Sequence, residues 1–174
     1  MLIVLGGLPG VGKSAIAREL ARLLPAVHVR IDSIEQALRE SGVTVVSLDD
    51  AGYRVGYAVA EDNLRLGHVV IADSVNPLPL TRDAWLQVAD RANVPGVEVE
   101  VVCSDEREHR RRVEQRLGEI RAPGAPTWEQ VASRDYRAWD RQHIVIDTAN
   151  RTPEQCATIL RAALPAHGFA AAPP

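Results

Sequence analysis

The chain has 174 residues, 46% hydrophobic and 25% charged, with a net charge of −3. This length suits one compact domain that buries roughly 70% of its unfolded surface, so two independently folding domains are not expected. The charge balance argues against a chain held mainly by nucleic-acid phosphates or anionic lipid, and no apolar run approaches the roughly 20 residues that span a bilayer.

The first half of the chain alternates between strand and helix patterns. Residues 1–5 are a continuous apolar run typical of a buried parallel strand, and the glycines of 6–12 interrupt it. Helical spacing then begins at Lys13 and stops at Pro25. In chain order, we next expect a strand at 27–32, a helix at 33–40, an irregular or strand-like stretch at 41–48, a helix at 50–66 and a strand at 69–72 that ends in Asp73.

The second half continues the alternation. Its first helix turns Trp85, Val88 and Ala89 inward. The remaining elements are a strand at 97–103, an arginine-rich helix from about Asp105 to Gly118, a helix capped by Thr127 with Gln130, a strand at 144–147 and a last helix opened by Thr152, Pro153 and Gln155.

Five strands alternating with helices predict an α/β fold with a parallel sheet covered on both faces. The expected domain covers residues 1–164, and residues 165–174 form a frayed tail. Cys103 and Cys156 lack paired spacing, so neither a disulfide framework nor a zinc site is indicated. The N-terminal MLIVLGG has no basic flank or cleavage site, which makes a cytoplasmic protein the expectation.

A glycine-rich loop carries the strongest functional signal. GLPGVGKS at 7–14 fits G-x-x-x-x-G-K-[ST], the phosphate-binding P-loop, between a strand and a helix. Glycines let backbone N–H groups converge on an anion at the positive end of the helix. Lys13 would reach the β- and γ-phosphates, and the Ser14 hydroxyl would complete the shell of Mg²⁺. The expected nucleotide-binding residues are Gly7, Pro9, Gly10, Val11, Gly12, Lys13, Ser14 and Ala15.

A dinucleotide-binding motif is the competing interpretation of the same loop. Residues 10–15 also fit G-x-G-x-x-[GA], and Asp32 lies 20 residues beyond Gly12, as a ribose-binding acid would. That interpretation gives no role to Lys13 or Ser14. The P-loop interpretation uses both, including the single lysine among the 20 basic residues, and is preferred.

Aspartates end three of the predicted strands, at the sheet edge where open α/β folds bind ligands. Asp73 follows four apolar residues, as in a Walker B strand, and would support Mg²⁺ through a water molecule. Asp32 is the candidate general base that orients an acceptor hydroxyl, with a helix-capping role as the alternative. Asp147 precedes a turn and is assigned a structural role.

The arginine-rich segment has two interpretations. Interleaved acids suggest a solvated helix with ion pairs four residues apart. Arg112 and Arg116, however, lie on one face of that helix, and a glycine- and proline-rich stretch follows at 118–126. A lid over about 107–127 that brings these arginines to a transferring phosphoryl group would explain both features.

Segments along most of the chain resemble small P-loop kinases. They are GLPGVGKS (7–14), RIDSIEQAL (30–38), VVIADSVNP (69–77) with Arg82 after it, EHRRRVEQR (108–116), PTWEQV (126–131), RDYRAWD (134–140) and VIDTA (145–149). The resemblance is to the AAA_33, zeta-toxin-like and polynucleotide-kinase-like grouping, and also to chloramphenicol phosphotransferase.

The resemblance implies a three-layer P-loop NTPase fold with strand order 2-3-1-4-5 and a helical lid. It also implies ATP, Mg²⁺ and transfer of the γ-phosphate to a hydroxyl of a small acceptor. Asp32 matches the acceptor-activating acid, Arg112 and Arg116 match paired lid arginines, and Arg82 matches a basic residue near the acceptor. A polynucleotide 5′-hydroxyl kinase and a nucleotide-binding NTPase without acceptor remain the alternatives, and the identity of the acceptor stays open.

Overall fold

The computed structural model describes residues 1–42, 48–117 and 126–164. Most of the stretch predicted at 41–48, the centre of the predicted lid and the whole predicted tail therefore lie outside the described residues.

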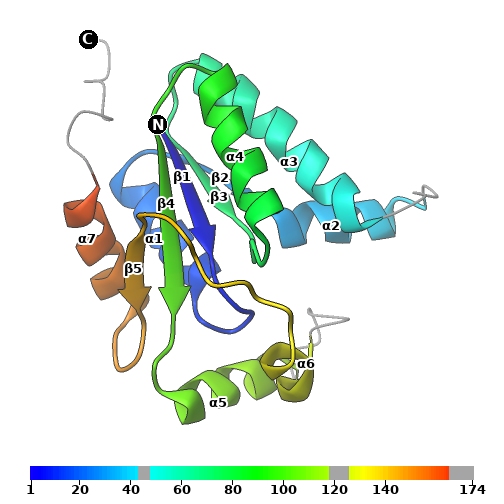
Figure 1. The fold of residues 1–174 in the computed structure, drawn as a ribbon, viewed down its shortest axis with the longest axis vertical. Helices are drawn as coiled ribbons and strands as arrows, with labels where there is room; N and C mark the ends of the chain where they lie inside the picture. The colour runs from blue at the N-terminus through cyan, green and yellow to red at the C-terminus, as the bar shows by residue number, and fades with distance from the viewer. Residues whose placement is uncertain (43–47, 118–125, 165–174) are drawn as a thin grey trace.

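A five-stranded sheet forms the centre of the molecule (Figure 1). Its strands are β1 (Leu2–Gly6), β2 (Val27–Arg30), β3 (Val70–Asp73), β4 (Gly96–Val102) and β5 (Ile144–Asp147). They run in the order β2-β3-β1-β4-β5, and every neighbouring pair is parallel. This arrangement confirms the predicted fold class and strand order. It also places the carboxyl ends of all five strands at one edge of the sheet.

Helices cover both faces of the sheet. Helix α1 (Lys13–Leu23) and helix α7 (Pro153–Ala163) pack on one face, around Ile3, Leu5 and Leu160. Helix α3 (Leu48–Arg65) and helix α4 (Pro79–Arg91) cover the other face. Trp85 of α4 is fully buried there, which confirms its predicted inward orientation. Because both faces are covered, β1 and β3 are buried along their length and apolar except for Asp73 at the end of β3.

Three further helices lie toward the carboxyl edge of the sheet: α2 (Ile31–Glu40), α5 (Glu106–Leu117) and α6 (Trp128–Ala132) (Figure 1). The predicted capping boxes open α6 at Thr127 and α7 at Thr152. In each, the threonine side chain accepts a hydrogen bond from the N3 backbone N–H, and the N3 glutamine side chain accepts one from the threonine N–H. These two predicted helix starts are confirmed.

The end of the second strand was predicted wrongly. Strand β2 stops at Arg30, opposite Asp73 of β3, and α2 begins at once with the buried Ile31. Asp32 therefore lies in the first turn of α2 and not at the end of a strand. No loop separates the two elements, so the sequence offered no glycine or proline to mark the boundary. This error is two residues, and the other predicted boundaries that fall on described residues also agree to within one or two residues.

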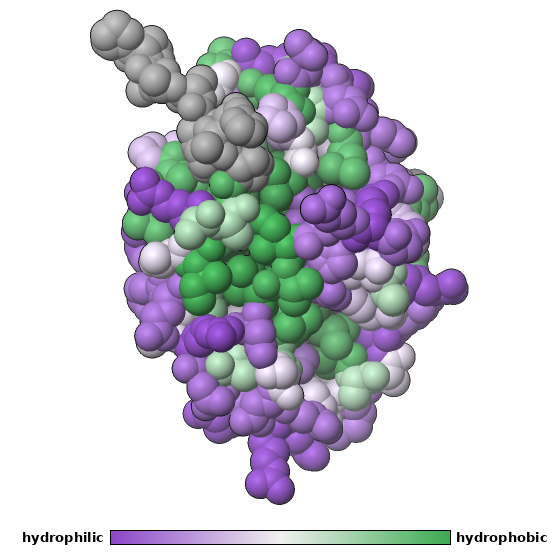
Figure 2. All heavy atoms as spheres, turned by 60° about the vertical axis from the view of Figure 1, so that its left-hand side comes forward, coloured by the Kyte–Doolittle hydropathy of each residue, from purple (hydrophilic) through white to green (hydrophobic). Residues whose placement is uncertain are grey.

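No helix among the described residues is both long and apolar enough to cross a membrane. Apolar side chains nevertheless reach the surface in places. Figure 2 shows a hydrophobic area on the face obtained by turning the left-hand side of Figure 1, where β5 and α7 lie, toward the viewer. Val145 of β5 and Ile159 of α7 are among the exposed large apolar residues.

Candidate active site

The glycine-rich loop adopts a conformation that only glycine accommodates easily. Gly12 has φ 104° and caps α1 without any side-chain hydrogen bond, so no side chain occupies the first turn of that helix. Gly10 has φ 86°, and a Cβ on it would lie 2.5 Å from Val113 of α5. The loop thus leaves the positive end of α1 free for an anion and packs against α5.

Three hydrogen bonds to residues outside the loop hold it in place. The Gly7 N–H donates to the Val75 carbonyl at 3.0 Å. His109 Nε2 lies 2.8 Å from the Pro9 carbonyl, and since a carbonyl only accepts, this nitrogen carries the proton. Burial lowers the pKa of His109, which favours the neutral imidazole. The Thr148 hydroxyl donates to the Val11 carbonyl at 2.9 Å.

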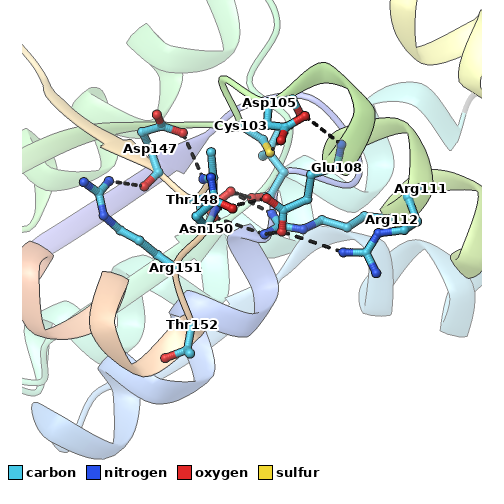
Figure 3. A network of polar contacts seen from close by, with 12 residues as sticks. Cys103, Asp105, Glu108, Arg111, Arg112, Asp147, Thr148, Asn150, Arg151 and Thr152 are labelled. Carbon is cyan, nitrogen blue, oxygen red and sulfur yellow. Dashed lines mark hydrogen bonds and ion pairs between the residues drawn. The ribbon is translucent and has the colours of Figure 1, made fainter.

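Arg112 connects α5 to Thr148, one of the residues that hold the loop (Figure 3). Its guanidinium donates to the Thr148 hydroxyl at 2.7 Å and to the Thr148 carbonyl at 3.1 Å, and it pairs with Glu108 at 2.7 Å. A Cβ placed on Gly12 would lie 3.9 Å from Arg112 Nη1. One of the two predicted lid arginines is therefore already beside the P-loop.

Lys13 is buried at the base of the loop. Its Nζ donates to the carbonyls of Gly7 at 2.7 Å and Leu8 at 3.0 Å. Burial lowers the pKa of Lys13 to about 8, although the carboxylates of Asp73 and Asp32 act in the opposite direction. The ammonium donates to neutral carbonyls, which are weaker acceptors than an anion, so a bound anion could replace them.

Asp73 lies at the end of β3, next to β1, and is almost fully buried. Burial opposes its ionisation. The hydrogen bond from His28 at 3.1 Å, the charge of Lys13 and a hydrogen bond from Ser14 outweigh that effect and lower the pKa of Asp73. The structure thus brings together the hydroxyl and the carboxylate predicted to hold Mg²⁺.

These two oxygen donors fit a magnesium site. Mg²⁺ is commonly bound by one or two protein oxygens together with the phosphates of a nucleotide, without a cage of protein ligands. The described part of the chain contains no group of three or more His, Cys, Asp or Glu that could hold a metal by itself.

A pocket of about 850 Å³ opens over the P-loop at the carboxyl edge of the sheet. Of the residues predicted for the site, it is lined by Pro9, Gly10, Gly12, Lys13, Ser14, Ala15, Asp32, Asp73, Arg112 and Arg116. One concave surface therefore collects most of the predicted nucleotide, metal and acceptor residues.

Asp32 faces this pocket within a pair of ionic contacts. Its Oδ2 accepts from Arg30 Nη2 at 3.0 Å and from Arg116 Nη2 at 3.1 Å. Arg116 thereby connects α5 to the first turn of α2 across the pocket. Asp32 does not cap α2, because the cap position of that helix is Arg30 and shows no side-chain cap hydrogen bond.

Arg82 is not brought to the pocket. It is 1% exposed, and its guanidinium donates to four main-chain carbonyls, those of Asn76, Pro77, Arg137 and Ala138. Its Cζ also lies 4.3 Å from the ring centre of Trp139. This placement corrects the expected contact with an acceptor, because the guanidinium is buried against the main chain.

Several residues of the site carried no recognisable signal in the sequence. His28 and His109 have no metal spacing. The contact of His28 with Asp73 spans 45 positions of the chain, and that of His109 with Pro9 spans 100. Arg134 lines the pocket from an irregular segment. Only its place in the resembling segment 134–140 singled that arginine out.

The strand order also decides against a dinucleotide site. In that motif the acid follows the strand next to the glycine-rich strand, where it can reach the ribose. Here β3 lies between β1 and β2. Asp32 is therefore one strand further from the loop than a ribose-binding acid would be.

Comparisons with known proteins agree with this architecture. The family model AAA_33, described as an AAA domain, matches residues 2–134. No curated protein matches the chain significantly.

Several solved structures share the fold. The APS kinase CysC of Mycobacterium tuberculosis, in complex with AMPPNP and APS, has a TM-score of 0.71 and 20% identity over 92% of this chain and 95% of that one. Kti12 of Chaetomium thermophilum, in complex with ADP-AlF3, has a TM-score of 0.67 and 20% identity over 98% and 100%. A sugar kinase of Janibacter sp. HTCC2649 has a TM-score of 0.66 and 15% identity over 92% and 92%. The predicted P-loop kinase fold is thereby confirmed.

Proposed function

We propose, from the premise that this chain belongs to the AAA_33 family of AAA domains, that it is an ATP-dependent phosphotransferase. It would move the γ-phosphate of MgATP to a hydroxyl of a small acceptor. One observation carries the proposal: Lys13, Ser14, Asp73 and Asp32 line a single pocket over the P-loop. Similar folds that bind AMPPNP or ADP-AlF3 support the choice of an adenine nucleotide.

The P-loop would bind the phosphates of ATP. Backbone N–H groups of the loop and the first turn of α1 would surround the β-phosphate, and the Lys13 ammonium would move from the carbonyls of Gly7 and Leu8 to the β- and γ-oxygens. Ser14 and Asp73 would hold Mg²⁺, Asp73 through water. When bound, that ion neutralises charge on the phosphate oxygens.

Asp32 would orient the acceptor for in-line attack. Its Oδ2 is held by Arg30 and Arg116, and its Oδ1 makes no hydrogen bond or ion pair with a described residue. An acceptor hydroxyl would donate to Oδ1, which receives the proton as the oxygen bonds to phosphorus. Arg116 pairs with Asp32 and lies in the same pocket as Lys13, so it would also stabilise charge on the transferring group.

Asp32→Asn tests this assignment. We expect ADP release that depends on a pool of hydroxyl-bearing small molecules to fall by about 100-fold or more, because the amide cannot accept the proton. MgATP affinity should stay near the wild-type value, since the P-loop is unchanged. The ion pairs of Asp32 are half exposed, so folding should be little affected.

Asp50→Asn is the matched control for that experiment. Asp50 is an exposed carboxylate that pairs with Arg54 on α3 and does not line the pocket.

ADP release that changes neither with the pool nor with the Asp32 substitution would favour an NTPase without acceptor. Release stimulated only by an oligonucleotide end would favour a polynucleotide 5′-hydroxyl kinase.

The affinity for MgATP is expected to fall about tenfold between pH 7 and pH 9. The pKa of Lys13 is about 8 in the ligand-free protein, so at pH 9 roughly one molecule in ten keeps the ammonium that the phosphates require. Binding at pH 9 should take up nearly one proton, measurable by calorimetry in two buffers of different ionisation enthalpy. Constant affinity without proton uptake would contradict the lowered pKa of Lys13.

The same depressed pKa affects folding in the opposite direction. Between pH 8 and 10.5 the folded protein binds fewer protons at Lys13 than the unfolded chain does. The contribution of this group to the free energy of unfolding therefore increases as the pH rises through that range.

A further inference from the structure

The pocket is more basic than the protein that contains it. Its lining includes seven basic side chains, Lys13, Arg18, Arg30, Arg39, Arg112, Arg116 and Arg134, against four acidic ones, Asp32, Glu35, Glu40 and Asp73. The chain as a whole has a net charge of −3. The local excess of positive charge is therefore a property of this site and not of the composition.

Arg134 has no ionic partner in the described part of the chain. Among the described residues, its backbone N–H donates to the Val131 carbonyl. Its side chain lines the pocket together with Lys13. By contrast, Arg137 three residues later pairs with Asp135 at 3.1 Å and does not line the pocket.

The backbone that carries Arg134 is held firmly although it forms no helix or strand. The Arg137 N–H donates to the Pro77 carbonyl at 2.9 Å, and buried Arg82 donates to the carbonyls of Arg137 and Ala138. On the other side, Arg134 follows Ser133, the C-cap residue of α6. An unpaired guanidinium is thus presented to the pocket from a fixed segment.

Arg30 offers a second donor without a partner. Its Nε is buried and makes no hydrogen bond with any described residue, since Asp73 Oδ2, with which it forms an ion pair, lies 3.9 Å away. A buried donor of this kind costs free energy unless a ligand satisfies it. Arg30 ends β2, which lies beyond β3 from the P-loop strand, so it faces the acceptor side of the pocket.

We propose that the acceptor carries an anionic group, a phosphate, sulfate or carboxylate, that Arg134 binds together with Arg30 while the acceptor hydroxyl lies at Asp32. This inference rests on the proposed phosphotransferase function and adds the class of its substrate. Arginine suits the role because its planar fork binds such oxyanions with two charge-assisted hydrogen bonds. The phosphates of ATP would be bound separately, by the P-loop and Lys13.

The first test uses inorganic sulfate on protein saturated with MgAMPPNP, so that the P-loop is already occupied. Sulfate should raise the melting temperature beyond chloride at equal ionic strength, in a saturable manner. Arg134→Gln should weaken the apparent sulfate affinity about tenfold, and Arg137→Gln should leave it unchanged. Arg134 is exposed, so its substitution should not impair folding.

Two results of this test would overturn the proposal. One is equal sulfate affinity in the wild type and in Arg134→Gln. The other is a substitution that weakens MgAMPPNP and not sulfate, which would place Arg134 on the nucleotide.

The second test compares acceptors in matched pairs: glucose with gluconate, glycerol with glycerol 3-phosphate, and adenosine with its 3′-phosphate. Anionic members should stimulate ADP release at least tenfold more than their neutral partners, and Arg134→Gln should remove that preference. Equal stimulation by neutral members would sink the anionic acceptor while leaving the phosphotransferase standing. Sulfate binding that needs Arg134, without stimulation by any compound, would support the anion site and count against the proposed function.

Discussion

Replacing Lys13 with alanine is expected to lower the turnover of MgATP by about 10³-fold or more. The ammonium is the charge that follows the γ-phosphate through a transition state whose negative charge lies on the phosphate oxygens. Lys13 is also the single lysine of the chain. Its Nζ is held between the carbonyls of Gly7 and Leu8, beside the expected phosphate site.

The single lysine allows a direct measurement. An ATP acyl-phosphate probe, which acylates amines near its phosphates, should label one side chain in the wild type, and free MgATP should block the reaction. Lys13→Ala should lose both this labelling and turnover, while Arg22→Ala, an exposed position on the same helix, should keep both. Labelling confined to the N-terminal amine of the wild type would refute the P-loop assignment.

Replacing Arg82 with alanine is expected to lower the free energy of unfolding by about 3–5 kcal/mol, because each buried carbonyl left without a donor costs about 1–3 kcal/mol. Four carbonyls would lose a hydrogen bond, although that of Pro77 keeps the Arg137 N–H as a donor, and the face of Trp139 would lose the guanidinium packed against it. Arg82→Lys should recover little of this loss, since one ammonium cannot reach carbonyls arranged around a planar fork.

Urea unfolding monitored by circular dichroism would check the magnitude. Arg91→Ala is the matched control, because Arg91 lies on the same helix, is half exposed and pairs with Glu61, so its loss should cost less than about 1 kcal/mol. A similar small cost for Arg82 would show that the segment after α6 is held by other contacts. It would also remove the structural reason for the placement of Arg134.

The P-loop and its flanking elements were predictable because they are local. An apolar strand, a turn rich in glycine and a helix beginning at Lys13 follow one another without interruption, and each depends only on neighbouring residues. The capping boxes at Thr127 and Thr152 were found for the same reason, since their partners lie three residues away.

Long-range contacts set the limits of that prediction. Asp32 was placed at a strand end, but tertiary pairing with β3 stops β2 at Arg30, and α2 starts without a loop. Arg82 was assigned to the acceptor because its position matched a family pattern. Only the fold shows that carbonyls of residues 137 and 138 surround it.

The sequence by itself determined the fold class and the glycine-rich loop between β1 and α1, and it singled out Lys13, Ser14 and Asp73 as candidates, because periodicity and motif spacing depend on adjacent residues. The tertiary structure decided which side chains share the pocket. Arg116 reaches Asp32 across 84 positions, and Arg134 reaches the pocket through a segment anchored by Arg82. Such long-range contacts depend on strand order and on packing between distant elements, and no local pattern encodes them.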